Sequence, residues 1–247
     1  MTKTIAEELA EKTYRELAKP KQPQARSRVW TDPEGYRYLV PWSNAVLLRF
    51  LIRMLTSDLP KSEYRRKAQA DDAARSVVRN IEEGYKRSTT SEYLQFIGYS
   101  QGSLEEVKGD IRELTEDRFL RTVRGSSLAG AGLDLGSFHR ALRGNKGQYR
   151  NLKDGKTDDG KGNKGKLKDG KEAGGRKPWE YRPLTVLYPP LAKVRAGYLT
   201  YEIFLELINK TDWNLRKLVE SLEKKLEDEQ MNWKVEQARI ASRLKMR

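Results

Sequence analysis

The chain has 247 residues, of which 37% are hydrophobic and 34% are charged, a balance that favours an elongated helical protein over a compact enzyme. Its formal net charge of +14 predicts attraction to a polyanion, with RNA and DNA as the leading candidates, although solubility alone also accounts for such a charge. The sequence contains no cysteine, which excludes disulfides and thiolate metal sites, and we expect a cytoplasmic protein without a membrane span.

Residues 1–40 are predicted to form a short helix, a basic arm and a turn ahead of the main fold. Apolar residues recur at helical intervals as far as Lys19, and prolines interleaved with basic residues follow. Residues 33–35 carry a proline and glycine turn signal. The aromatic side chains behind this turn are expected to pack as a cap on the fold, with stacking on nucleic-acid bases as the alternative: Tyr36, Tyr38 and Trp42.

Residues 41–127 are predicted to contain three helices, at about 42–57, 62–83 and 91–120. In the third helix small or apolar residues alternate at intervals of four and three residues, which keeps one stripe facing a partner helix. A similar stripe runs along the second helix. With a fourth helix near the C-terminus, the pattern predicts an all-α, antiparallel, up-down four-helix bundle. Its predicted buried residues include Val77, Ile81, Ile97, Leu104, Ile111, Phe204, Leu215 and Leu222.

The connection between the second and third helices is specified from both sides. Gly84 at the end of the second helix is expected to adopt the left-handed conformation, which glycine takes at no steric cost. Thr89 and Glu92, three residues apart, predict a capping box at the start of the third helix. The two signals together predict a tight turn and a helical hairpin.

Residues 128–198 differ in composition and are predicted to hold a long basic loop. Between Arg143 and Lys177 lie nine of the nineteen glycines, with twelve Lys and Arg against five Asp and Glu, so half of the net charge falls there. The segment has too little apolar surface to offset the entropy of ordering it, and we expect it to be mobile. An extended stretch is expected to lead from it back to the bundle.

Residues 199–247 are predicted to form the fourth helix and a polar helical tail. The helix is expected at about residues 200–226, with Thr200 in the N-cap position that Thr favours. Several apolar residues of the predicted helices exceed what one stripe per helix can bury, so we expect another copy of the chain to cover them. These residues are Leu47, Leu51, Leu55 and Val219.

Three segments of the chain resemble a known family: Asn80 to Tyr85, Ser91 to Phe96 and Gly102 to Glu106. They are similar to the core signature of the four helix bundle protein family. That family includes proteins encoded in intervening sequences of bacterial 23S ribosomal RNA genes and the accessory variability protein of diversity-generating retroelements. The resemblance implies a basic homo-oligomer, commonly a pentamer, that binds nucleic acid and, in the retroelement branch, a reverse transcriptase. Glu82 stands where the family usually has a small residue.

Catalytic chemistry finds little support in the sequence. His139 is the only histidine, which removes the usual general base and any paired imidazole ligands, and we expect an ordinary structural or surface role for it. Neighbouring carboxylates such as Asp71 and Asp72 point about 100° apart on a helix, so they do not converge on a metal ion. We therefore predict a non-enzymatic protein without a metal or a cofactor.

Basic residues remain as the candidate site. Arg75, Arg79 and Lys86 share the side of the second helix that faces away from its apolar stripe, and Arg87 adds charge at the turn. An internally compensated surface is the alternative, because acidic residues share that side. The candidate phosphate-binding residues are Arg75, Arg79, Lys86, Arg87, Lys161, Lys164, Lys166 and Lys168. The predicted function is binding to RNA or DNA through backbone phosphates, and the competing function is a protein-interaction scaffold.

Overall fold

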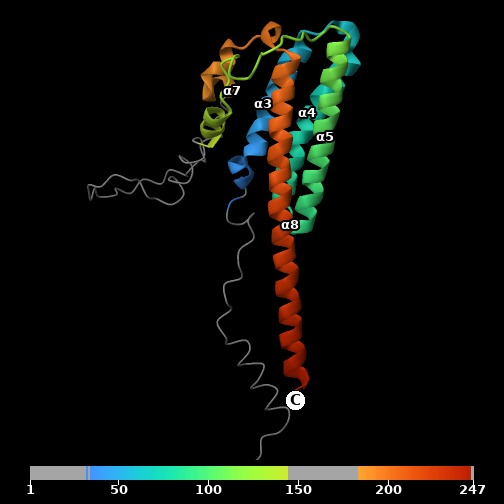
Figure 1. The fold of residues 1–247 in the computed structure, drawn as a ribbon, viewed down its shortest axis with the longest axis vertical. Coiled ribbons are helices and arrows are strands. Elements are labelled where there is room, and N and C mark those ends of the chain that lie inside the picture. Colours follow the sequence, from blue (N-terminus) through green and yellow to red (C-terminus); the bar gives the residue numbers. More distant parts are fainter. Residues whose placement is uncertain (1–31, 33, 144–182, 246–247) are drawn as a thin grey trace, which may run out of the picture.

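A computed structural model describes residue 32, residues 34–143 and residues 183–245 of the chain. Four long helices lie side by side in it (Figure 1): α3 (Val40–Ser57), α4 (Tyr64–Lys86), α5 (Thr90–Glu116) and α8 (Tyr201–Lys245). Shorter helical pieces are η1 (Gly35–Tyr38), η2 (Lys61–Glu63), α7 (Leu184–Leu187), η3 (Pro189–Lys193) and η4 (Ala196–Tyr198), and residues 135–143 are also helical. These ranges contain no strand, so the all-α prediction is confirmed for them.

The four predicted bundle helices are present, and the polar tail after the fourth is helical as predicted. The helix expected at 200–226 and the tail form one element, because α8 continues without a break to Lys245. Every predicted core residue is buried: Val77, Ile81, Ile97, Leu104, Ile111, Phe204, Leu215 and Leu222. The predicted N-terminal helix and arm, and the basic loop from residue 144 onward, lie outside the described residues.

Most of α3 is buried because other segments pack around it, and its exposed residues are Val40, Arg53 and Ser57. Pro41 stands in its first turn, where the fixed φ of proline favours a helix. α4 and α8 contact it, and residues 120–142 and 184–199 contribute the rest of the same core beside it (Figure 1). The expectation that another copy must cover the surplus apolar residues is therefore wrong for Leu47, Leu51 and Leu55, which are buried within one chain, while Val219 is partly buried.

α4 and α5 pack closely because residue 84 has no side chain. Gly84 lies inside α4, two residues before its end, and its φ is not positive. A Cβ atom there would lie 2.8 Å from both Phe96 Cβ and Tyr93 Cδ2 on α5. The prediction of a left-handed helix end at Gly84 is therefore wrong, since this glycine permits a close approach between helices instead.

The capping box at the start of α5 is confirmed. The Thr89 hydroxyl accepts a hydrogen bond from the Glu92 backbone N–H at 3.1 Å, and the Glu92 carboxylate accepts one from the Thr89 N–H at 3.4 Å. Hydrogen bonding from Thr89 lowers the pKa of Glu92, which keeps the carboxylate charged beside the positive end of the helix. The start of α5 is thus fixed by two side chains that satisfy each other's backbone groups.

A left-handed residue follows the end of α5, whereas none ends α4. Arg118 has a φ of 65°, its N–H donates to the Thr115 carbonyl at 3.0 Å, and the N–H of Phe119 donates to the Leu114 carbonyl at 2.9 Å. This pair of bonds is the Schellman motif, in which glycine is the usual residue. The chain then turns toward α8, where Tyr201 N–H donates to the Arg121 carbonyl at 3.0 Å.

The segments between α5 and α8 are anchored to α8 by backbone N–H groups. The Glu202 carboxylate accepts from the Val123 N–H at 3.0 Å, and the Glu206 carboxylate accepts from the Leu128 N–H at 2.7 Å. The extended return was predicted for residues 179–191, and it is wrong for the part that the structure describes, because residues 184–187 and 189–193 form short helical turns. The reason is that its prolines fix φ at a value that helical turns share.

One carboxylate between α4 and α5 is poorly satisfied. Asp110 on α5 accepts a hydrogen bond from Gln69 of α4 at 3.0 Å through Oδ1, while its buried Oδ2 has no partner. Burial, followed by the nearby charges of Glu113 and Glu106, raises the pKa of Asp110 to about 6. An ionised Asp110 therefore destabilises the packed helices at neutral pH.

Gly84→Ala should lower the free energy of unfolding by roughly 1–3 kcal/mol, because the added methyl group must displace Tyr93 and Phe96. Gly98→Ala in α5 is the matched control, since a Cβ there meets nothing within 4 Å. Relief of backbone entropy should make that variant more stable by up to about 1 kcal/mol. Urea unfolding of both proteins measures the difference, and equal effects would contradict the close-packing role of Gly84.

Asp110→Asn should raise stability at pH 7 and flatten its dependence on pH. The folded pKa of about 6 lies above the usual value of 3.8, so the folded state binds the proton more tightly than the unfolded state does. This contribution to stability is fully present below pH 3.8 and is lost as the pH rises through about 6. Melting temperatures of both proteins between pH 4 and 7 test it, and parallel curves would show that Asp110 titrates normally.

Candidate nucleic-acid interface

The predicted basic residues of α4 lie on one exposed face, as expected from their spacing. Arg75, Arg79 and Lys86 are exposed along the helix, and Arg87 follows directly after its end. Residues four and seven positions apart on a helix point in similar directions, so the first three form one row. The structure therefore brings them together as a line of cations rather than as a cluster.

Local carboxylates compensate the two arginines in the middle of this row. Arg75 pairs with Asp72 at 3.7 Å, and Arg79 pairs with Glu82 at 3.0 Å. The alternative considered from the sequence, a compensated helix surface, is correct for this pair of arginines. Exposed pairs of this kind contribute little to stability, and both guanidinium groups remain at the surface.

The two cations at the end of α4 contact aromatic rings. The Lys86 ammonium lies 5.7 Å from the centre of the Tyr36 ring, and the Arg87 guanidinium lies 4.2 Å from that of Phe96. Such contacts hold the cations in place without neutralising them. The predicted loop lysines, Lys161, Lys164, Lys166 and Lys168, lie outside the described residues.

Glu82 has a structural role that the sequence did not indicate. Its Oε1 accepts a hydrogen bond from Trp42 Nε1 at 3.0 Å, while Oε2 pairs with Arg79. Trp42 and Tyr36 are both buried with ring centres 5.3 Å apart, so the predicted cap is confirmed for these two, whereas Tyr38 is exposed. Glu82 thus ties the aromatic cap at the start of α3 to α4.

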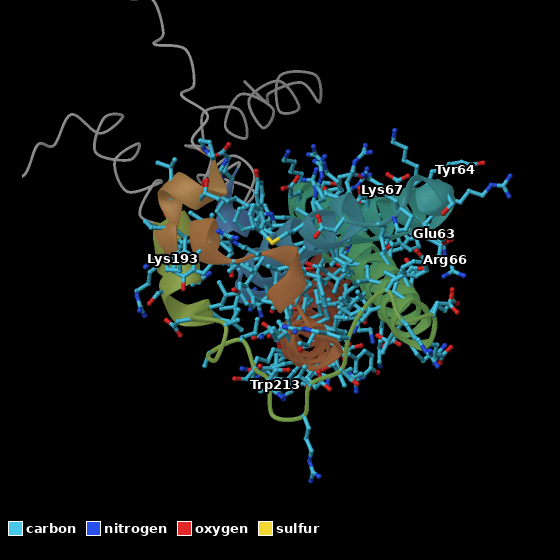
Figure 2. The ribbon with its side chains drawn as sticks, turned by 90° about the horizontal axis from the view of Figure 1, so that it is seen from above. Glu63, Tyr64, Arg66, Lys67, Lys193 and Trp213 are labelled. Atoms are coloured by element: carbon cyan, nitrogen blue, oxygen red, sulfur yellow. The ribbon has the colours of Figure 1, made fainter. Side chains whose placement is uncertain are left out.

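A second group of cations lies at the opposite end of α4 and was missed. We call it the basic end: Lys61, Arg65, Arg66, Lys67, Arg118, Arg121 and Arg124, with only Asp58, Glu63 and Asp117 as acids in residues 58–67 and 117–124. An ion pair between Arg66 and Asp117 brings the two stretches together. Figure 2 looks onto this end and shows Tyr64, Arg66 and Lys67 projecting from the start of α4. The run of four basic residues within seven positions was the available sequence signal.

The basic end also exposes aromatic surface. The Tyr64 side chain is 63% exposed, and its hydroxyl accepts a hydrogen bond from Arg65 Nε at 3.1 Å. Phe119, beside the left-handed Arg118, is exposed as well. Exposed rings next to cations suit single-stranded nucleic acids, since bases stack on the rings while phosphates meet the charges.

Charge is divided between the helices of the bundle. α3 and α4 together carry eight Lys and Arg against four Asp and Glu, whereas α5 carries two against six, and α8 is balanced at nine of each. α5 therefore repels a polyanion, while the surface made by α3, α4 and the basic end attracts one. Positive charge is therefore distributed unevenly over the molecule.

Metal-binding side chains do not cluster in the described ranges. No group of three or more His, Asp or Glu side chains is placed to hold a metal ion there. His139 Nδ1 lies 3.0 Å from the Ser43 hydroxyl, which agrees with the structural role expected for it. Among the helices that the structure describes, none combines the length and the apolar character that a membrane crossing requires.

These features define the class of protein: a basic helical bundle whose positive charge is gathered on one side and one end. Residues 37–129 match the model of a family described as 23S rRNA-intervening sequence protein, which confirms the family resemblance over that span. The match ends before α8. No curated protein and no solved structure matches the chain.

Glu82→Ala should lower the free energy of unfolding by about 1–3 kcal/mol, because it leaves the Trp42 indole N–H without its partner in a buried cap. Glu83→Ala is the matched control, since Glu83 is exposed on the same helix and its removal should change stability by less than about 0.5 kcal/mol. Chemical unfolding monitored by tryptophan fluorescence compares the two. Equal stabilities would show that the bond to Trp42 contributes nothing.

Proposed function

We propose that the protein binds nucleic acid through backbone phosphates and has no enzymatic activity. The observation that carries this proposal is the division of charge, since exposed cations lie along α4 and at the basic end while α5 carries six acids against two cations. Such a surface orients a polyanion along α4 and away from α5. The match of residues 37–129 to a family named for ribosomal RNA genes supports the same proposal.

Binding of this kind is tolerant of sequence. Phosphate contacts need only positive charge at the surface, whereas base reading in a duplex needs an element placed in a groove. The basic end offers Lys and Arg side chains beside the exposed rings of Tyr64 and Phe119, which suits phosphate contacts and stacking. Single-stranded or structured RNA fits the exposed rings better than a regular duplex does.

The family resemblance extends the proposal further. It suggests that α3, α4, α5 and α8 form an antiparallel up-down bundle and that several copies assemble, commonly five. Assembly would repeat the basic end by symmetry and strengthen weak individual patches through avidity. A reverse transcriptase partner, as in the retroelement branch, belongs to the same proposal. The apolar surplus no longer supports assembly, because α3 is covered within its own chain.

One observation favours the competing scaffold function. Beyond Glu229, α8 exposes Met231, Trp233, Val235 and Ile240, which are large apolar side chains at the surface of a single helix. Surface of this composition suits a protein partner rather than phosphate. Salt separates the two functions, since phosphate binding weakens steeply as salt rises and apolar contacts do not.

Neutralising the basic end should weaken binding to a single-stranded RNA of arbitrary sequence. The variant with Arg65, Lys67, Arg121 and Arg124 all changed to Gln should lose roughly tenfold or more in affinity at 100 mM salt and should show a shallower salt dependence. Changing Arg75, Arg79, Lys86 and Arg87 to Gln should cost less, because the first two are already paired with acids.

The matched control changes four cations of α8, whose charge is balanced: Arg216, Lys217, Lys224 and Lys225. Fluorescence anisotropy at 50 and 200 mM salt measures all three variants, and the control should bind almost as the wild type does. Equal losses in all three would mean that only net charge matters. Absence of binding to RNA and DNA by the wild type at 50 mM salt would replace this proposal with the scaffold function.

A further inference from the structure

A cavity of about 430 Å³ lies between the start of α3, the helix at residues 135–143 and residues 209–214 of α8. Its volume falls within the roughly 300–1,000 Å³ typical of small-ligand sites. Apolar walls and several amide side chains line it: Val40, Asn44, Leu135, His139, Asn209 and Trp213. None of these residues belongs to the basic end or to the row of cations on α4.

Asn44 is the unusual member of this lining. The residue is only 1% exposed, and neither its Oδ1 nor its Nδ2 has a hydrogen-bond partner among the described residues. A buried amide without partners costs stability, and apolar side chains fill such positions more favourably. Rotation about the terminal torsion of Asn is soft, so the amide can present its donor and acceptor together to a ligand in the cavity.

Trp213 supplies the second feature of the site. Its side chain is 60% exposed at the edge of the cavity, and Lys217 lies 6.0 Å from the ring centre. Figure 2 shows Trp213 beside α8, on a different side of the molecule from Tyr64. An exposed indole next to a cation is a stacking platform for a planar ring.

His139 and its surroundings suit a neutral ring that carries a phosphate. Burial, with a smaller contribution from the charge of Arg143, lowers the pKa of His139, so the imidazole is neutral at pH 7. Its Nδ1 contacts Ser43, and its Nε2 has no partner among the described residues. Arg143, whose charge acts on His139, follows on the same short helix and adds positive charge near the cavity for a phosphate group, whereas Arg140 pairs with Asp134 at 3.9 Å.

We propose that this cavity binds a single unpaired nucleobase, which stacks on Trp213 and pairs its donor and acceptor edge with the Asn44 amide. An Asn side chain and a base such as adenine present complementary pairs of one donor and one acceptor. The base can belong to a nucleic-acid strand or to a free nucleotide. The inference deepens the proposed function, and where the base belongs to a nucleic-acid strand it rests on that function.

The test compares two single strands of eight nucleotides with equal phosphate charge, an oligoadenylate and an abasic strand. The wild type should bind the adenylate about tenfold more tightly than the abasic strand. Trp213→Ala and Asn44→Leu should each abolish this preference while leaving affinity for the abasic strand unchanged. Trp233→Ala is the matched control, since Trp233 is 65% exposed on the same helix but lies outside the cavity, and it should keep the preference.

Adenosine monophosphate separates the two sources of the base. If the wild type binds the free nucleotide and Asn44→Leu does not, the cavity is assigned to nucleotides. This assignment holds even if no strand binds at low salt, a result that would refute the proposed function but not the nucleobase site. Equal binding of the two strands by the wild type, or no binding of either strand or of the nucleotide, overturns the nucleobase site.

Stability gives an independent reading of Asn44. Because its amide has no partner, Asn44→Leu should melt at the same temperature as the wild type or higher. A melting temperature lower by many degrees would show that the amide has a structural role and would overturn its assignment to a ligand. Trp213→Ala, a change at an exposed side chain, keeps the binding test valid in that event.

Discussion

The close approach of α4 to α5 at Gly84 is the constraint on which the rest of the structure depends. With no side chain at this position, the ring of Tyr93 and the Cβ of Phe96 pack directly against the α4 backbone. The next residue, Tyr85, contacts both the aromatic cap and α5, with its ring centre 6.1 Å from that of Tyr36 and 6.2 Å from that of Tyr93. The absence of a side chain at Gly84 therefore sets the packing of the α4–α5 hairpin and, through Tyr85, that of the aromatic cap.

Gly35, the residue before Tyr36, also permits a close aromatic contact. A Cβ at Gly35 would lie 1.8 Å from the Tyr85 hydroxyl oxygen, so Gly84 makes room for Tyr93 and Gly35 makes room for Tyr85. Lys86 and Arg87 then reach the outer faces of Tyr36 and Phe96. The cations at this end of α4 are positioned by the packing of the hairpin, which links the core to the surface that we propose meets phosphate.

How far the sequence predicts this structure depends on which interactions decide each feature. The 4-3 stripe on α5 and the Thr89–Glu92 box are local patterns, and both predictions are confirmed. Gly84 and Arg118 are different, because whether glycine serves a turn or a contact depends on what the partner helix places beside it. The burial of α3 depends in part on residues 120–142, 184–199 and α8, which are distant in sequence, so its surplus apolar residues were interpreted as a surface for another copy.

The candidate site shows the same limit. Spacing along one helix correctly placed Arg75, Arg79 and Lys86 on one face, but their neutralising carboxylates were weighed only as an alternative. The basic end joins two stretches that are some fifty residues apart, and only the fold brings them together. The cavity at Asn44 draws its walls from α3, residues 135–143 and α8, and no local pattern marks such an arrangement.

α8 has very different surroundings along its length. Phe204 and Leu215 are fully buried, Leu222 is nearly so, and every residue from Glu227 to Ser242 is exposed, while the helix runs past the other three (Figure 1). The contact from Thr90 to Glu229 at 3.0 Å lies near the last point of support. Beyond it, the helix depends on its own backbone bonds and on pairs such as Arg239 with Glu236. Amide hydrogen exchange along this one helix should therefore run from globally protected to freely fraying, so that a single element records both the stability of the bundle and that of an isolated helix.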